Sequence, residues 1–118
     1  MINSPKTYDL EERTAKFGES VIGLMKKLPK NEVTKPLINQ LIRCATSVGA
    51  NYCEADDAES KMDFKHKIGI CKKEARESKH FLRMMAKAEP FYKDEITANW
   101  REAKELNLIF NSIFQKIK

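Results

Sequence analysis

The chain contains 118 residues and has a formal net charge of +5 at pH 7, and this length forms one hydrophobic core but is too short for two. We therefore expect a single domain spanning residues 1–118, with residues 1–6 loose, and the low content of Gly and Pro, four of each, favours helices over sandwiches or barrels. No apolar run approaches the ~20 residues of a membrane span, and the first residues lack the basic-then-apolar order of a signal peptide, so we expect a cytoplasmic protein.

Apolar residues recur at helical spacing in the first half of the chain and predict two helices. The first covers residues 8–28 and ends at Pro29, and the second opens near Thr34 and Pro36, because Pro suits a first helical turn. Small residues at Ala45 and Gly49 of the second helix should let a neighbouring helix approach closely. The predicted core positions are Leu10, Phe17, Val21, Leu24, Met25 and Leu28, followed by Leu37, Leu41, Cys44, Ala45, Val48, Tyr52 and Ala55.

The second half of the chain predicts two more helices of similar length. Ser60, with Asp63 three residues later, resembles a capping box that starts the third helix, and Pro90 ends it. The fourth helix runs from about Asp94 to residue 118. Their predicted core positions are Phe64, Ile68, Cys71, Ala75, Leu82 and Met85, then Ile96, Trp100, Ala103, Leu106, Phe110, Ile113 and Ile117. Four helices of similar length with short connections predict an all-α fold, an antiparallel up-down-up-down four-helix bundle.

The three cysteines, Cys44, Cys53 and Cys71, show no Cys-x-x-Cys spacing and lie inside helical patterns. We interpret them as reduced thiols that line the core.

The positive charge concentrates in the third helix, where residues 61–87 hold nine basic and three acidic side chains, a net charge of +6. At about 100° per residue, six of the cations fall within roughly 60° of one another and reach about 33 Å along the axis. This basic stripe consists of Lys61, Lys65, Lys72, Arg76, Lys79 and Arg83. Such a surface attracts phosphates without reading sequence. A merely solvated helix face is the alternative. No aromatic residue interleaves with the stripe, so single-strand base stacking is not indicated.

Polar residues also border the apolar faces of the second and third helices. Glu74 and Glu77 interrupt an apolar track made by Ile70, Phe81 and Met84, and we expect partners for them such as Arg43 or Asn51. We predict a structural polar network composed of Arg43, Ser47, Asn51, Glu54, Glu74 and Glu77.

The sequence shows no pattern that predicts an enzyme. Glu77 to His80 has the Glu-x-x-His form of di-iron sites, and Asp63 to His66 imitates it, but both lie on the same predicted helix. The two His would be about 21 Å apart along that helix. No phosphate-binding loop occurs, and we expect no cofactor and no bound metal.

The stretch from 47 to 85 resembles the 23S rRNA intervening-sequence protein family of bacterial four-helix-bundle proteins. The resemblance is carried by Ser47, Gly49, Ala50, Asn51 and Glu54, then by Ser60, Asp63 and Phe64, then by Glu74 and Glu77. It implies a homopentameric ring with no known enzymatic activity. A related group, the accessory variability determinant proteins of diversity-generating retroelements, forms similar basic pentamers that associate with a reverse transcriptase and nucleic acid.

Our leading hypothesis is a non-catalytic, homo-oligomeric scaffold or accessory factor that binds RNA or DNA through the basic stripe. A protein-binding adaptor without a nucleic-acid role is the first alternative, in which Ile70, Phe81 and Met84 join subunits and the stripe docks an acidic partner. A metal-binding, ferritin-like enzyme is the second.

Overall fold

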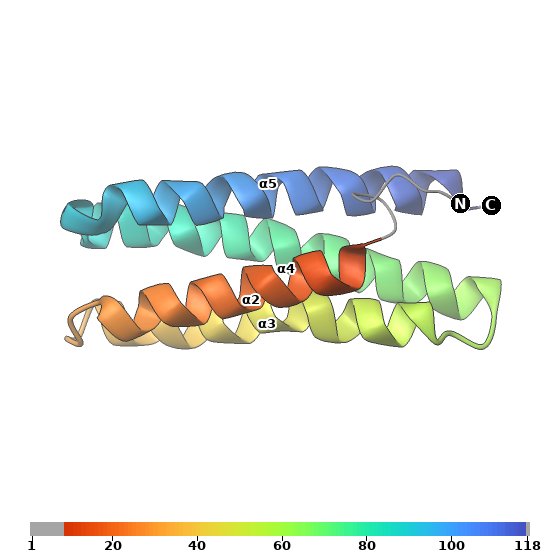
Figure 1. The fold of residues 1–118 in the computed structure, drawn as a ribbon, viewed down its shortest axis with the longest axis horizontal. Helices are drawn as coiled ribbons and strands as arrows, with labels where there is room; N and C mark the ends of the chain where they lie inside the picture. The colour runs from red at the N-terminus through yellow and green to blue at the C-terminus, as the bar shows by residue number, and fades with distance from the viewer. Residues whose placement is uncertain (1–8, 118) are drawn as a thin grey trace.

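A computed structural model describes residues 9–117, which form four α-helices and one short 3₁₀-helix (Figure 1). The elements in chain order are α2 (Leu10–Lys27), α3 (Thr34–Asp56), α4 (Lys61–Ala88), η1 (Pro90–Tyr92) and α5 (Lys93–Lys116). No strand occurs in these residues, so the prediction of an all-α, four-helix fold is confirmed. The expectation for residues 1–6 falls outside the described part of the chain.

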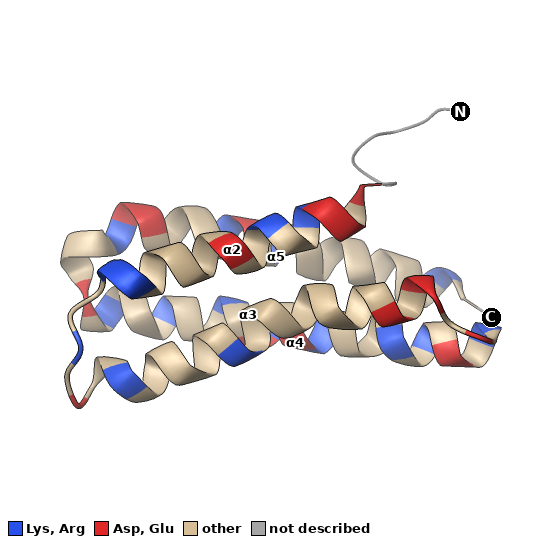
Figure 2. Ribbon diagram, turned by 60° about the horizontal axis from the view of Figure 1, so that its bottom comes forward, with Lys and Arg blue, Asp and Glu red and all other residues tan. Residues whose placement is uncertain are grey.

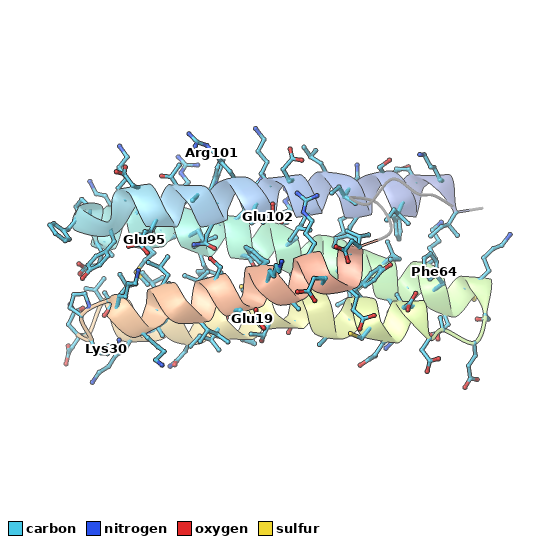
Figure 3. The ribbon with its side chains drawn as sticks, viewed as in Figure 1. Glu19, Lys30, Phe64, Glu95, Arg101 and Glu102 are labelled. Carbon is cyan, nitrogen blue, oxygen red and sulfur yellow. The ribbon has the colours of Figure 1, made fainter. Side chains whose placement is uncertain are left out.

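Consecutive helices run antiparallel, with α2 beside α3 and α4 beside α5 (Figure 1). α4 packs extensively on both α3 and α5, whereas α2 and α5 have the sparsest contacts of the four sides. α2 has 18 residues and α4 has 28, so α3, α4 and α5 extend beyond the first turn of α2. Phe64 lies at this extended end (Figure 3).

The core consists largely of the positions that the helical periodicity predicts. The six positions predicted between Leu10 and Leu28, the C-terminal cap of α2, are all buried. Five of the six positions predicted in α4 are buried as well. Leu37 is only half-buried, because its neighbour Ile38 takes the core position. The other predicted residues that are half-buried are Tyr52, Phe64, Trp100, Ile113 and Ile117.

Gly49 of α3 allows α2 to approach closely, and Gly18 of α2 lies at the same contact between the helices. A Cβ on Gly49 would lie 3.2 Å from Oγ1 of Thr14, and one on Gly18 would lie 3.6 Å from the Cα of Thr46. Thr14 avoids an unpaired buried hydroxyl because its Oγ1 donates to the carbonyl of Leu10 at 2.7 Å. The small-residue patch predicted around Gly49 is therefore where α2 packs.

The predicted ends of α4 agree with the structure. The backbone N–H of Asp63 donates to Oγ of Ser60 at 3.0 Å, which caps the first turn. α4 ends at Ala88, and Pro90 begins η1. The start of α3 uses a residue that we did not predict, since Oδ1 of Asn31 accepts from the backbone N–H groups of Val33 and Thr34.

The prediction that all three cysteines line the core is wrong for Cys53, which is exposed on α3, while Cys44 and Cys71 are buried. Burial raises the pKa of the Cys71 thiol to about 12 and also raises that of Cys44. Because the thiolate is the reactive form, we expect Ellman's reagent to modify one thiol per native chain at pH 8 and three in guanidinium. Cys53→Ser should remove the fast reaction, and two fast thiols in the native protein would contradict this arrangement.

Candidate nucleic-acid interface

Opposite charges lie on different sides of α4. Its three acidic residues are Asp63, Glu74 and Glu77, and the last two face α3, where they contact Arg43. Lys65, Lys72 and Lys79 of the basic stripe lie on the side next to α5, where they contact its aromatic rings. Figure 2 shows Lys and Arg positions along α4. Within residues 9–117, none of the six cations of the stripe forms an ion pair. Their positive charge is therefore not cancelled by neighbouring carboxylates.

Two aromatic rings of α5 lie against this stripe. The Nζ atoms of Lys65 and Lys72 lie 4.9 and 4.6 Å from the ring centroid of Phe114. Nζ of Lys79 lies 6.0 Å from the ring of Trp100, and Lys104 of α5 adds a contact of 5.6 Å to the same indole. The interpretation that no aromatic residue interleaves with the basic residues is thus wrong for the folded chain, because α5 supplies the rings. We call this combined surface the α4–α5 seam.

Helix geometry explains why both rings reach the seam. Trp100 and Phe114 are fourteen residues apart on α5, which leaves them within about 40° of each other around the helix axis. Gly69 of α4 makes room for the second ring, since a Cβ there would lie 3.2 Å from Cε1 of Phe114. Between the rings, Nδ2 of Asn107 donates to the backbone carbonyl of Lys72 at 2.8 Å and joins the two helices.

A shallow hollow lies beside each ring. The hollow at Trp100 has a volume of about 310 Å³, and Arg83 stands among its otherwise uncharged lining residues, Leu82, Ala86, Ile96 and Thr97. The hollow at Phe114 has a volume of about 410 Å³ and is lined by Met62, Lys65, His66, Gly69, Ile70 and Lys73. Each hollow therefore combines an aromatic wall, aliphatic surface and at least one cation.

The predicted polar network divides into separate contacts. Arg43 Nη1 donates to Oε1 of the buried Glu74 at 3.3 Å, and its Nη2 donates to Glu77. Asn51 is not a partner of either carboxylate, because its Nδ2 donates to the carbonyl of Ser47 at 2.9 Å. Glu54 instead accepts from Nζ of Lys67 at 2.6 Å. Only Arg43, Glu74 and Glu77 form one cluster, and they join α3 to α4.

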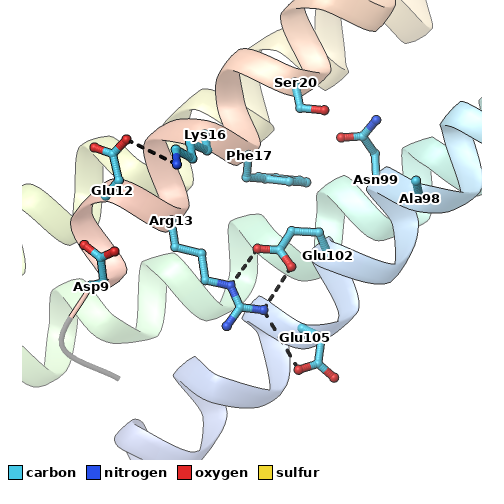
Figure 4. Close-up of a pocket in the computed structure, with 10 residues that line it drawn as sticks. All are labelled: Asp9, Glu12, Arg13, Lys16, Phe17, Ser20, Ala98, Asn99, Glu102 and Glu105. Carbon is cyan, nitrogen blue, oxygen red and sulfur yellow. Dashed lines mark hydrogen bonds and ion pairs between the residues drawn. The ribbon is translucent and has the colours of Figure 1, made fainter. Parts of the chain in front are cut away.

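A hollow of about 560 Å³ lies between α2 and α5 (Figure 4). Arg13 forms a two-pronged contact there with Glu102, at 2.7 Å from Nε and 2.9 Å from Nη2. These hydrogen bonds raise the pKa of Arg13. Arg13 and Glu102 lie on helices that are far apart in the sequence, so the helical periodicity did not predict this ion pair. Because the charges already satisfy one another, we interpret this contact as a link that holds α2 against α5.

Among the described residues, no group of three or more His, Cys, Asp or Glu side chains is placed to hold a metal ion. His66 and His80 are both exposed on α4. In the same part of the chain, every helix falls short of the combined length and hydropathy that a bilayer-crossing segment requires.

Comparisons with known proteins agree with this fold. The family model described as "23S rRNA-intervening sequence protein" matches residues 6–112. A crystal structure of a protein of unknown function from the S23 ribosomal protein family of Bacteroides thetaiotaomicron superposes with a TM-score of 0.83 at 27% sequence identity. The match covers 94% of this chain and 99% of that one. No curated protein matches the chain.

Proposed function

The chain belongs to the 23S rRNA-intervening sequence protein family, and we propose that it is a non-catalytic, homo-oligomeric binding protein whose α4–α5 seam contacts nucleic acid. The observation that carries this proposal is the basic stripe, whose six cations form no ion pair among the described residues. Glu74 and Glu77 of α4 pair with Arg43 of α3 and with no cation of the stripe, so the stripe keeps its positive charge for an approaching polyanion.

The dimensions of the stripe suit a nucleic-acid backbone. Lys61 and Arg83 lie about 33 Å apart along α4, and a nucleic-acid strand carries one phosphate per 3.4 Å or so of helical rise. Several phosphates can therefore contact cations at once. Lys61, Arg76 and Arg83 are exposed, whereas Lys65, Lys72 and Lys79 are half-buried with their ammonium groups at the aromatic rings.

Self-assembly is the second part of the proposal, and its support is the resemblance that implies a pentameric ring. α4 also presents an apolar track on the side of Glu74 and Glu77, in which Met84 is 36% exposed and Ile70 and Phe81 are half-buried. A contact between copies would remove this track from water. Light scattering should give a mass several times that of one chain, and a monomer at all concentrations would contradict this part.

The same apolar track favours one alternative function, an adaptor that binds an acidic protein. Exposed Met62, which extends the track toward the start of α4, would serve such a partner as well as a second copy. Binding of an acidic polypeptide in preference to RNA would support this alternative.

Salt dependence tests the proposed function directly. We expect a labelled single-stranded RNA of 20 nucleotides to bind in fluorescence anisotropy, with log Kd linear in log salt. If all six cations contact phosphates, the slope should be about 4, which weakens binding about 300-fold between 50 and 200 mM salt. Absence of binding at 50 mM salt, or affinity that does not change with salt, would contradict the proposal.

A further inference from the structure

Both hollows of the α4–α5 seam place an aromatic ring next to cations, an arrangement that ion-pairing with phosphates alone does not require. Trp100 has Lys79, Lys104 and Arg83 around it, and Phe114 has Lys65 and Lys72. Neither ring is fully buried in the core, since both side chains are half-buried on the surface of the bundle. Base stacking on exposed aromatic rings between cations is how sequence-tolerant single-strand binding proteins hold their ligands.

We propose that the seam binds unpaired nucleotides, with one base stacked at Trp100 and another at Phe114 and with the phosphates between them on the basic stripe. This inference rests on the proposed function and names its ligand as single-stranded nucleic acid. The phosphates of a duplex can contact the cations of the stripe equally well. The bases of a duplex, however, are already stacked on one another and cannot enter the hollows without being flipped out.

The lysines at the rings have a role in this arrangement. Their ammonium groups lie 4.6 to 6.0 Å from the ring centroids in the free protein, which are weak cation–π contacts at partly exposed positions. An incoming base stacks on the ring in place of the ammonium group. The long, flexible lysine side chain then turns that ammonium group toward the adjoining phosphate. Base and phosphate of one nucleotide are then bound by neighbouring groups of the same hollow.

The distance between the rings sets the length of the strand. Fourteen residues of α5 correspond to about 21 Å, which is about six nucleotides at the rise of a stacked strand. Lys72, Arg76 and Lys79 of α4 lie along this interval, so the linking phosphates meet cations. Affinity should therefore rise steeply between oligonucleotides of three and eight nucleotides and level off beyond that.

Trp100 is the only tryptophan in the chain, so its emission reports on one of the two proposed stacking sites. We expect a 12-nucleotide oligouridine to quench this emission, with a midpoint equal to the Kd from anisotropy of the same labelled strand. A 12-base-pair RNA duplex should bind at least about tenfold more weakly and leave the emission nearly unchanged. A strand and a duplex that bind equally tightly, without quenching, would overturn the inference.

Substitution of the second ring gives an independent test. Phe114→Leu keeps an apolar side chain over Gly69 but removes the stacking surface, and we expect about 5- to 150-fold weaker binding of the strand with duplex binding unchanged. Phe91→Leu is the matched control, because Phe91 is 90% exposed on η1, outside the seam, and should alter affinity less than twofold. Equal strand affinity for Phe114→Leu and the native protein would refute the inference.

The outcomes separate this inference from the proposed function. Salt-dependent binding of strand and duplex alike, insensitive to Phe114, refutes base stacking and leaves the proposed function in place. Binding of neither nucleic acid at 50 mM salt refutes both. Binding of polyglutamate as tightly as oligouridine refutes the choice of ligand. If Phe114→Leu fails to fold, the tryptophan quenching and the comparison of strand with duplex decide the question alone.

Discussion

Reversing Lys61, Arg76 and Arg83 to glutamate is expected to weaken RNA binding roughly 100-fold or more at 50 mM salt. All three side chains are exposed, and none forms an ion pair within residues 9–117, so their replacement should leave the bundle folded. The six cations of the basic stripe would then be three cations and three anions, with no net charge. The salt slope should also fall by about 2, because each lost phosphate contact with a single strand removes about 0.7 from it.

A matched variant controls for overall charge. Lys16, Lys26 and Lys35 are exposed on α2 and α3, and their reversal changes the net charge of the protein by the same amount without touching the seam. We expect this variant to lose several-fold in affinity at most, because distant exposed charges are screened at this ionic strength. Equal losses in the two variants would show that net charge, and not the α4–α5 seam, determines binding.

Phe110→Ala should have the largest effect on stability. The Phe110 ring is completely buried on α5 and lies 5.9 Å, centroid to centroid, from Tyr52 of α3. Removing a buried ring leaves a cavity and typically costs about 3 to 5 kcal/mol of unfolding free energy. Phe114 lies one turn further along α5, so the same variant should also loosen the seating of its ring against Gly69 and weaken binding of single-stranded RNA.

Urea denaturation followed by circular dichroism at 222 nm measures this loss. Phe91→Ala removes the same ring from a position that is 90% exposed, and we expect it to change the unfolding free energy by less than about 0.5 kcal/mol. A Phe110→Ala variant that costs less than 1 kcal/mol or so would mean that the Phe110 ring is not buried against Tyr52 in the core as described.

The sequence predicts the bundle well because each helix carries its own signal. A residue such as Leu41 or Leu106 recurs at the helical period among other apolar residues, and its burial follows from the need of each helix to cover that face. Ser60 and Pro90 mark the ends of α4 by rules that involve only neighbouring residues. These features require no knowledge of which helices are adjacent.

Contacts between helices are where the sequence interpretation fails. Periodicity assigned Trp100 to the core and gave Phe114 no role, whereas both rings lie at the edge of α5 where α4 brings lysines against them. Arg43 and Asn51 were both expected partners for Glu74 by polarity, and the structure confirms only Arg43, which lies opposite that carboxylate on the α3–α4 interface. The link from Arg13 to Glu102 also depends on α2 lying beside α5. Such pairs follow from helix rotation and order around the bundle, which a single sequence does not encode locally.

The most direct measurement of the central claim is lysine footprinting by mass spectrometry, with and without a saturating 12-nucleotide oligouridine. If the α4–α5 seam is the nucleic-acid interface, acetylation of Lys61, Lys65, Lys72 and Lys79 should slow several-fold in the complex. Lys16 and Lys26 of α2 and Lys35 of α3 should react at the same rate as in the free protein. Protection of the α2–α3 lysines, with the seam lysines unaffected, would contradict the claim.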